Sequence, residues 1–388
     1  MLLYGKNELY KSLMASSSEN LYALLEFAEK YGIKGNLIMA KIAWLIMMDE
    51  NPFSLSIERN DAKGTAEEFA KKDIGEFYNL FFSTPSKDLL NYTPAKANIS
   101  GEESRIGRLV MSFVSCLDKA KSEDQFFDYV KGFYIKHGVG RFGLHKAFYM
   151  LDSGDITPVS QVREVCFEDI IGYELQKEKL IANTCSFAEG KGANNVLLYG
   201  DSGTGKSTSI KAVLNMFYDK GVRMIQVEKH QFRHLSTLTE SLKKRNYRFI
   251  IYMDDLSFED FEVEYKYLKA SIEGGLEEKP ENVLIYATSN RRHLIKETFS
   301  EREGGDDIHR KESIEEKISL SDRFGLSIFY PRPAQKEFFD IVLKLAQREN
   351  IYMPEDQLIA EARRWGMSHS GYSGRTATQF INHLKTKN

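Results

Sequence analysis

Hydrophobic and polar residues follow two different periods along the chain. Over residues 19–150 apolar positions recur every three or four residues, the spacing of amphipathic helices. In NLYALLEFAEKYG, for example, one helix face carries Leu21, Leu24, Leu25 and Ala28. Glycine and proline breaks divide this part into about five or six such segments. The pattern predicts an all-α N-terminal domain over residues 1–151.

The pattern changes at Phe167 to short apolar runs that alternate with helical segments. These runs are NVLLYG, MIQVEK, RFIIYMDD, VLIYATSN and LSIFYP. Such alternation is typical of a parallel sheet with crossover helices, so we predict a five-stranded α/β domain over residues 167–332. A polar stretch, DSGDITPVSQVRE, predicts a linker over residues 152–166. After Pro333 helical spacing returns and predicts a small helical domain over residues 333–388.

Composition narrows the class of protein. Hydrophobic residues make up 42% and charged residues 28% of the chain, as in globular proteins. The net charge of −3 provides no general attraction for nucleic acid. Three cysteines are too few for a disulfide framework, so we expect a reduced, cytoplasmic setting. The most apolar run, LIMAKIAWLIMM, is shorter than the roughly 20 residues of a membrane span and predicts a buried helix, with no membrane contact.

The segment NVLLYGDSGTGKST contains the pattern G-x-x-x-x-G-K-[ST] between an apolar strand and a helix-forming stretch. In such a loop the glycines let backbone N–H groups converge on a phosphate. The lysine reaches the terminal phosphates, and the hydroxyl after it can ligate Mg²⁺. We therefore predict a nucleotide site with Ser207 as a magnesium ligand, formed by Gly200, Asp201, Ser202, Gly203, Thr204, Gly205, Lys206, Ser207 and Thr208.

A second apolar run, RFIIYMDD, ends in Asp254 and Asp255. A glycine-rich loop of this kind is called a P-loop. It is accompanied by a neighbouring strand whose end places an acidic residue near the magnesium ion. We therefore predict that Asp254 supports the metal through water and that Asp255 faces the attacking water. An alternative is that both acids cap a helix beginning near Ser257, since aspartate is favoured there.

Three polar residues further along the chain are candidates for contacts with the nucleotide. Asn290 ends the run VLIYATSN, where an amide could orient water near a γ-phosphate or could simply form a turn. Arg323 lies in SLSDRFG and Arg375 in SGRTATQF. Each arginine, taken alone, is typical of a surface charge.

Taken together, the order and spacing of these motifs resemble the AAA+ ATPases over residues 166–387. GDSGTGKS resembles the Walker A motif of that family and IIYMDD its Walker B motif. The resemblance implies a parallel sheet of order 5-1-4-3-2 with a C-terminal helical lid. It also implies ATP and Mg²⁺ as ligands and a ring-shaped homo-oligomer, often a hexamer.

The same resemblance implies roles for individual residues. FEDIIGYELQKEKL is similar to the element before the P-loop in AAA+ proteins, in which adenine would be bordered by Ile170, Ile171 and Gly172. Asn290 would be the sensor 1 residue, Arg323 the arginine finger that acts on a neighbouring subunit, and Arg375 the sensor 2 residue. Together with Asp255, these three complete the expected catalytic set.

Within the AAA+ proteins, NNVLLYGDSGTGKS, YMDDLSFED and YATSNRRHL resemble a prokaryotic ATP-binding family known only as a domain of unknown function. The chain departs from the broader pattern at Asp255, where glutamate is usual. Aspartate is one methylene shorter, which moves its carboxylate back by about 1.5 Å. A general base must come within roughly 2.6–3.2 Å of its proton or act through water, so we expect a working but slow ATPase. Glu259 is a weaker candidate for the same role.

These expectations define a function and two alternatives. We expect an ATPase that couples hydrolysis to the remodelling or loading of an unknown protein or nucleic-acid client, selected by the N-terminal domain. A nucleotide-dependent switch with little hydrolysis is the first alternative, and Asp255 favours it. A P-loop kinase for a small molecule is the second, and it has no use for a finger acting in trans.

Two further segments have simple interpretations. The mixed-charge stretch from Arg291 to Lys317 is typical of a solvated loop, or of a partner contact. GVGRFG, residues 138–143, matches G-x-G-x-x-G but follows a helical stretch, so we interpret it as a helix break and not as a dinucleotide site.

Overall fold

A computed structural model describes residues 3–4, 18–61, 64–83, 92–95, 101–258, 262–273, 280–291, 294, 320–369 and 371–386. Glu259 and most of the stretch from Arg291 to Lys317 lie outside the described residues. The chain forms two compact units. The first comprises Met1–Ala147, Pro158–Val162 and Lys244–Tyr247, and the second comprises Phe148–Thr157, Arg163–Lys243 and Arg248–Asn388.

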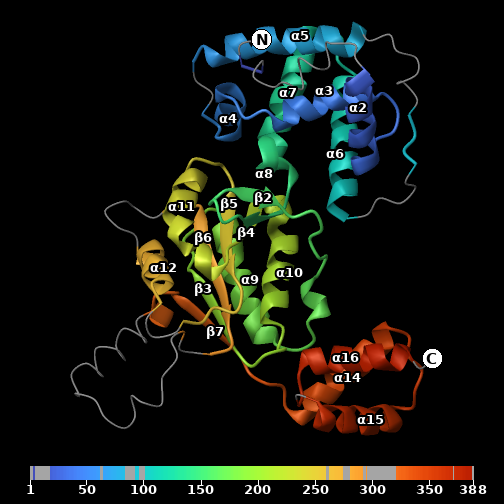
Figure 1. The fold of residues 1–388 in the computed structure, drawn as a ribbon, viewed down its shortest axis with the longest axis vertical. Coiled ribbons are helices and arrows are strands. Elements are labelled where there is room, and N and C mark those ends of the chain that lie inside the picture. Colours follow the sequence, from blue (N-terminus) through green and yellow to red (C-terminus); the bar gives the residue numbers. More distant parts are fainter. Residues whose placement is uncertain are drawn as a thin grey trace. The chain divides into compact units, whose positions relative to one another are not determined.

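The first unit is helical and packs around one apolar core (Figure 1). Its α3 helix is the apolar run LIMAKIAWLIMM, and it is buried along most of its length, which confirms the prediction of a buried helix. Asn36 begins this helix, since its side chain accepts the backbone N–H groups of Ile38 and Met39. The described helices are α2 (Ser18–Tyr31), α3 (Leu37–Met48), α4 (Pro52–Glu58), α5 (Ala66–Ser83), α6 (Gly101–Leu117), α7 (Glu123–His137) and α8 (Gly140–Leu144).

A buried ion pair binds residues far apart in the sequence within the first unit. The guanidinium of Arg245 donates to both carboxylate oxygens of Glu58, at 2.7 and 2.8 Å, and to Glu50 at 2.9 Å. Only 7% of the Arg245 side chain and 3% of the Glu58 side chain are exposed. Arg245 therefore fixes the segment Lys244–Tyr247 in the first unit, although the helix before it, α11 (Leu235–Lys243), and the strand after it, β5 (Arg248–Met253), belong to the second.

Gly138, the first glycine of GVGRFG, makes room for this segment. Helix α7 ends at His137 with Gly138 as its cap, which confirms the interpretation as a helix break. A Cβ atom on Gly138 would lie 1.7 Å from the Tyr247 hydroxyl, which donates to the carbonyl of His137 at 3.0 Å. Gly138 also has a positive φ of 73°, so a larger residue is excluded by both space and backbone conformation.

Replacing Arg245 with alanine is expected to destabilise the first unit by about 3 kcal/mol, because Glu58 is left charged, buried and without its bidentate partner. The measurement is urea unfolding followed by Trp44 fluorescence in a Trp365→Phe background, since Trp44 lies in the first unit and Trp365 in the second. Lys71→Ala is the control, because its pair with Asp124 is exposed and should leave the midpoint unchanged. An unchanged midpoint for Arg245→Ala would contradict the prediction.

Within the part of the second unit that the structure describes, seven strands form one sheet in the order β2-β1-β4-β5-β6-β3-β7. The pairs β4–β5, β5–β6, β6–β3 and β3–β7 are all parallel. Parallel strands end at a common edge, and here that edge carries Gly200 as the last residue of β3, Asp254 after β5 and Asn290 after β6. The strands are β1 (Ala147–Met150), β2 (Ile156–Pro158), β3 (Val196–Gly200), β4 (Val222–Gln226), β5 (Arg248–Met253), β6 (Val283–Ser289) and β7 (Leu326–Tyr330).

The predicted sheet of five strands in the order 5-1-4-3-2 is therefore wrong as stated, because β1 and β2 extend the sheet beyond β4. Strands β3 to β7 follow one another as β7-β3-β6-β5-β4 within the longer order. The two additional strands have only four and three residues, too few for a clear alternating pattern. The glycine of DSGD serves a tight turn there, with Gly154 donating to the carbonyl of Leu151 at 2.9 Å.

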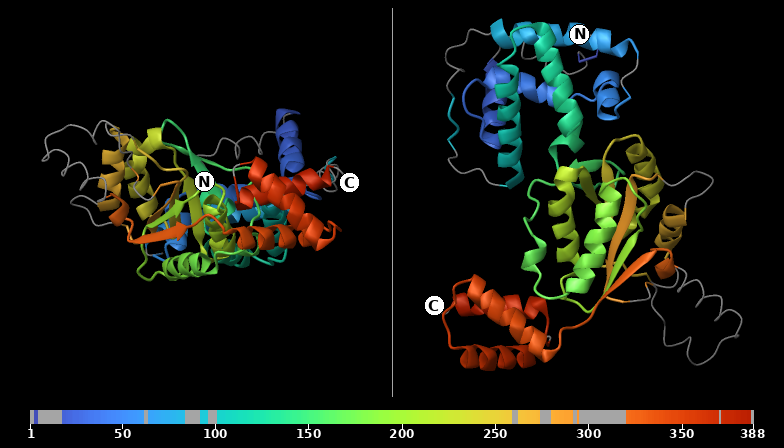
Figure 2. Two further views of the ribbon diagram at one scale, coloured as in Figure 1. Left: turned by 90° about the horizontal axis from the view of Figure 1, so that it is seen from below. Right: turned by 180° about the vertical axis from the view of Figure 1, so that it is seen from behind.

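Helices cover both faces of the sheet. In Figure 1 and Figure 2, α9 (Glu174–Ala188) and α10 (Lys206–Phe217) lie on one side, and α11 (Leu235–Lys243) and α12 (Glu264–Glu273) lie on the other. Single turns of 3₁₀ helix occur at Phe167–Asp169 and Tyr218–Lys220, and a longer one at Lys229–His234. Because α12 begins only at Glu264, the alternative in which Asp254 and Asp255 cap a helix near Ser257 is wrong.

Three C-terminal helices have a separate apolar core, which includes Phe338, Leu358 and Phe380. They are α14 (Gln335–Arg348), α15 (Glu355–Ser368) and α16 (Gly374–Lys385), and we refer to them as the lid. Among the helices that the structure describes, none combines the length and apolar character needed to cross a membrane.

Candidate nucleotide-binding site

The loop between β3 and α10 closes on itself through its own polar groups. The Lys206 ammonium donates to the carbonyl oxygens of Gly200 and Asp201, both at 2.7 Å, and Thr204 donates to the Asp201 carbonyl at 2.8 Å. Gly200 has a φ of 134°, and a Cβ atom there would lie 2.1 Å from the carbonyl oxygen of Tyr330. Only glycine fits that approach of two neighbouring strands. The loop thus leads directly into the N-terminus of α10, where an anion is favoured.

Lys206 is held at the base of the loop, with 6% of its surface exposed. Its ammonium also donates to the side-chain oxygen of Asn290 at 3.1 Å. Burial lowers the pKa of Lys206 below its ordinary value, although the charges of Asp201, Asp255 and Asp254 act in the opposite direction. The described hydrogen-bond partners of this buried cation are carbonyl and amide oxygens. The oxygens of a phosphate that enters the loop could replace them.

Ser207 and Asp254 lie together at the start of α10. The Ser207 hydroxyl donates to Asp254 Oδ1 at 2.7 Å, and the Thr288 hydroxyl donates to the same oxygen at 2.7 Å. Burial raises the pKa of Asp254, but the hydroxyl groups of Thr288, Tyr252 and Ser207 and the charge of Lys211 outweigh it, so the pKa lies below its ordinary value. Asp254 is therefore a carboxylate, next to a hydroxyl, at the edge of the sheet.

This pair of oxygen donors fits Mg²⁺, which prefers hard oxygen ligands and is usually bound by one or two carboxylates together with substrate phosphates. Within the described residues, no group of three or more His, Cys, Asp and Glu side chains could hold a metal ion. A magnesium site at Ser207 and Asp254 would thus require oxygens from a nucleotide and from water. That requirement matches a metal that binds with its nucleotide.

Asp255 points to a different partner from Asp254. Its Oδ1 accepts a hydrogen bond from the Asn290 amide at 2.7 Å. The Asp255 backbone is left-handed, with φ of 51°, a conformation that aspartate and asparagine tolerate better than most residues. Asn290 therefore bridges Asp255 and Lys206, and both Asp255 and Asn290 are exposed at the mouth of the loop.

The segment before α9 contacts both the loop and the lid. Ile170 is 6% exposed, and its Cγ2 atom lies 3.4 Å from the place that a Cβ on Gly205 would occupy. Ile171 packs against the apolar core of the lid. Gly172 follows with a positive φ of 81°. The segment therefore lines the approach to the loop with apolar groups, as a base-binding wall would require.

The start of α16 lies against the P-loop. The backbone N–H of Arg375 donates to the carbonyl of Gly203 at 3.2 Å, and its guanidinium donates to the hydroxyl of Ser202 at 3.3 Å. Thr208, the last residue of the predicted set, is half-buried in the first turn of α10. The lid therefore contacts the loop through Arg375, one of the two arginines predicted to act at the site.

Arg323 has a different environment. Its guanidinium forms an ion pair with Glu273 at the C-terminal end of α12. In the single chain Arg323 is therefore engaged outside the network of Lys206, Asn290 and Asp255.

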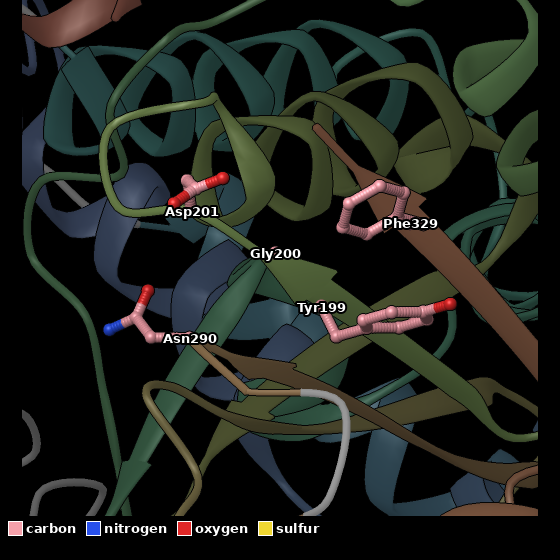
Figure 3. A pocket seen from close by; sticks show the side chains of 5 residues that line it. All are labelled: Tyr199, Gly200, Asp201, Asn290 and Phe329. Carbon is pink, nitrogen blue, oxygen red and sulfur yellow. The ribbon is translucent and has the colours of Figure 1, made fainter. Parts of the chain in front are cut away.

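A cavity of about 360 Å³ opens beside the loop, at the ends of β3, β6 and β7. The rings of Tyr199 and Phe329, whose centroids are 5.2 Å apart, form one part of its wall. Figure 3 shows them on one side of Gly200 and the side chains of Asp201 and Asn290 on the other. The cavity therefore extends the site from the phosphate loop toward solvent.

Two residues of this region were missed by the sequence analysis, namely Thr288 and Glu273. Thr288 could have been found from strand alternation, because it lies two residues before Asn290 and side chains two apart in an extended chain point to the same side. The sheet register pairs Met253 with Ala287, which sets Asp254 beside Thr288. Glu273 carries no comparable signal, since its position depends on how α12 ends.

Comparisons with solved structures return distant likenesses. A point mutant of RuvB from Thermotoga maritima matches with 16% identity and a TM-score of 0.41, covering 58% of this chain and 66% of that chain. The AAA domain of FIGL-1 in complex with ADP matches with 16% identity and a TM-score of 0.39, covering 57% of this chain and 72% of that chain. Likenesses at these scores define neither the activity nor the partners of this chain.

No curated protein matches the sequence. A family match is nevertheless clear and extends from residue 143 to residue 388, which is more than half of the chain. It includes the whole nucleotide-binding loop, the twin aspartates and the lid. The chain belongs to the family described as "Protein of unknown function (DUF815)", which confirms the predicted membership of an uncharacterised family.

Proposed function

We propose that the protein is an AAA+ ATPase that binds Mg-ATP between the P-loop and the lid and hydrolyses it. The observation that carries the proposal is the continuous polar network from Lys206 through Asn290 to Asp255, beside the Ser207–Asp254 pair. It contains a cation for phosphate, two oxygens for a metal and a carboxylate for water.

Each residue of the network then has a role. Lys206 exchanges its carbonyl and amide partners for phosphate oxygens when ATP enters the loop. Ser207 and Asp254 would hold Mg²⁺, which would supply positive charge next to the phosphates. Asn290, released from Lys206, contacts the γ-phosphate, and Asp255 orients the attacking water. Arg375 acts in cis and links phosphate binding to the lid.

The arrangement of the network supports slow turnover. Asp255 begins with its carboxylate bonded to Asn290, so hydrolysis requires that this bond be broken or shared. The same bond also favours the alternative of a nucleotide-dependent switch with little hydrolysis. Steady-state phosphate release from the purified protein, with and without Mg²⁺, tests the proposal: magnesium-dependent release supports the ATPase, and tight ATP binding without release supports the switch.

We further propose a ring-shaped homo-oligomer in the cytoplasm, in which Arg323 of one subunit completes the site of the next. Arg323 would exchange its cis partner Glu273 for the γ-phosphate of the neighbouring subunit. The helical first unit would select the client, a protein or a nucleic acid. Size measurement with and without ATP tests the assembly.

Arg323→Ala is expected to keep ATP affinity within about threefold of wild type and to lower turnover about tenfold or more, because a finger acts only on transition-state charge. Both quantities are measured at protein concentrations at which the ring is assembled. Arg363→Ala, which removes an exposed arginine of the lid, is the control and should turn over normally. Wild-type turnover by assembled Arg323→Ala protein would rule out a finger at this position.

A further inference from the structure

Thr288 is the residue that joins the two aspartates to the sheet. It lies in β6 and is only 2% exposed. Its backbone carbonyl accepts the N–H of Leu256 at 2.7 Å. Its hydroxyl accepts the N–H of Asp255 at 2.9 Å and donates to Asp254 Oδ1 at 2.7 Å. One residue thus holds three successive residues at the end of β5.

The directions of these bonds are fixed by chemistry. A carboxylate can only accept and a backbone N–H can only donate, so the single hydroxyl proton of Thr288 must go to Asp254. A lone pair of the same oxygen then receives the N–H of Asp255. The hydroxyl therefore couples the side chain of one aspartate to the backbone of the other.

This coupling bears on how the two carboxylates diverge. The N–H of Asp255 is held while its backbone adopts the left-handed conformation, with φ of 51°. A non-glycine residue in that conformation is disfavoured unless its surroundings stabilise it. As a result, the Asp254 carboxylate meets Ser207 and the Asp255 carboxylate meets Asn290.

We propose that Thr288 is a positioning residue that assigns the twin aspartates to separate tasks, Asp254 to the metal and Asp255 to water. The proposal rests on the proposed function, because it presumes Mg-ATP at this site. The Thr288 hydroxyl is bonded to Asp254 and to the backbone of Asp255, so in this role it acts through the two acids. A threonine that merely fills the space between β5 and β6 would be replaceable by valine, which has nearly the same shape and no hydroxyl.

The experiment compares Thr288→Val with Thr288→Ser in the full chain. The first readout is the affinity for Mn²⁺ in the presence of ATP, measured by electron paramagnetic resonance, and the second is steady-state phosphate release. For Thr288→Val we expect about tenfold weaker Mn²⁺ binding and about tenfold or more slower release. Thr288→Ser restores the hydroxyl and should bring both values to within about threefold of wild type.

Thr184→Val is the matched control. Thr184 is also fully buried in the second unit, and its hydroxyl bonds to the Leu180 carbonyl and the Tyr286 hydroxyl, each at 2.8 Å. It should change stability without changing Mn²⁺ affinity. If Thr288→Val does not fold, Thr288→Cys compared with Thr288→Ser gives the same test, because the thiol is a much weaker donor of similar shape.

The outcomes separate the two proposals. Wild-type Mn²⁺ affinity in Thr288→Val, or in Thr288→Cys where that variant is used, overturns the positioning role whatever the rate of hydrolysis. Weaker Mn²⁺ binding that serine restores supports the role. Wild-type protein that binds Mn-ATP but releases no phosphate overturns the proposed hydrolysis alone, since the metal readout does not depend on turnover.

Discussion

Lys206→Ala is expected to weaken ATP binding about 1,000-fold, a loss of about 4 kcal/mol. The ammonium is buried and already surrounded by oxygen atoms, two from the loop carbonyls and one from Asn290. A phosphate that enters the loop therefore meets a cation that is already held at the base of the loop. Alanine would leave those oxygens facing the phosphate, so repulsion adds to the lost attraction.

The measurement is the dissociation constant of Mg-ATP, obtained by calorimetry. Lys206→Met separates charge from packing, because methionine keeps much of the side-chain volume at a position that is 6% exposed. It should bind ATP as poorly as the alanine variant. Lys220→Ala removes an exposed lysine of the same unit and should bind normally. ATP affinity within about threefold of wild type in Lys206→Ala would show that the loop does not hold the nucleotide in the proposed way.

Asp255→Asn is expected to lower phosphate release about 1,000-fold while ATP affinity stays within about threefold of wild type. The amide cannot accept a proton from water, but asparagine tolerates the left-handed backbone of this position as well as aspartate does. The substitution therefore removes the proton acceptor and leaves the fold of the strand end intact.

Two further variants provide a control and a test of side-chain length. Asp219→Asn removes an exposed carboxylate elsewhere in the second unit and should release phosphate at the wild-type rate. Asp255→Glu lengthens the side chain by about 1.5 Å and tests whether reach limits the rate. Undiminished release by Asp255→Asn would exclude Asp255 as the residue that activates water.

Much of the nucleotide site could be predicted because its signals are local. The loop around Gly200 and Lys206 is a contiguous pattern, and Asp254 and Asn290 each end an apolar run. The meeting of their side chains follows from the parallel sheet, whose strands end at one edge. Arg375, by contrast, is typical of a surface charge when taken alone, and only the family resemblance pointed to it.

The features that the sequence did not reveal depend on backbone conformation and on contacts between residues far apart along the chain. The length of the Asp255 side chain was readable, but the left-handed backbone that turns it toward Asn290 was not, because that conformation is stabilised by Thr288 on another strand. Strand β1 lies at the end of the segment predicted as all-α, and β2 lies within the predicted linker, since strands this short show no periodicity. The partnership of Arg323 with Glu273 likewise depends on packing.

The ion pair between Arg245 and Glu58 can form only late in the synthesis of the chain. The two residues are 187 positions apart, so a ribosome adding about 5–20 residues per second makes Arg245 about 10–40 s after Glu58. By then β3, β4 and α11 of the second unit have already been translated. The first unit therefore cannot finish folding before much of the second unit has been synthesised. The last residues of the first unit, Lys244–Tyr247, directly precede β5. The helical unit is therefore complete only when β5, which the twin aspartates follow, is about to be synthesised.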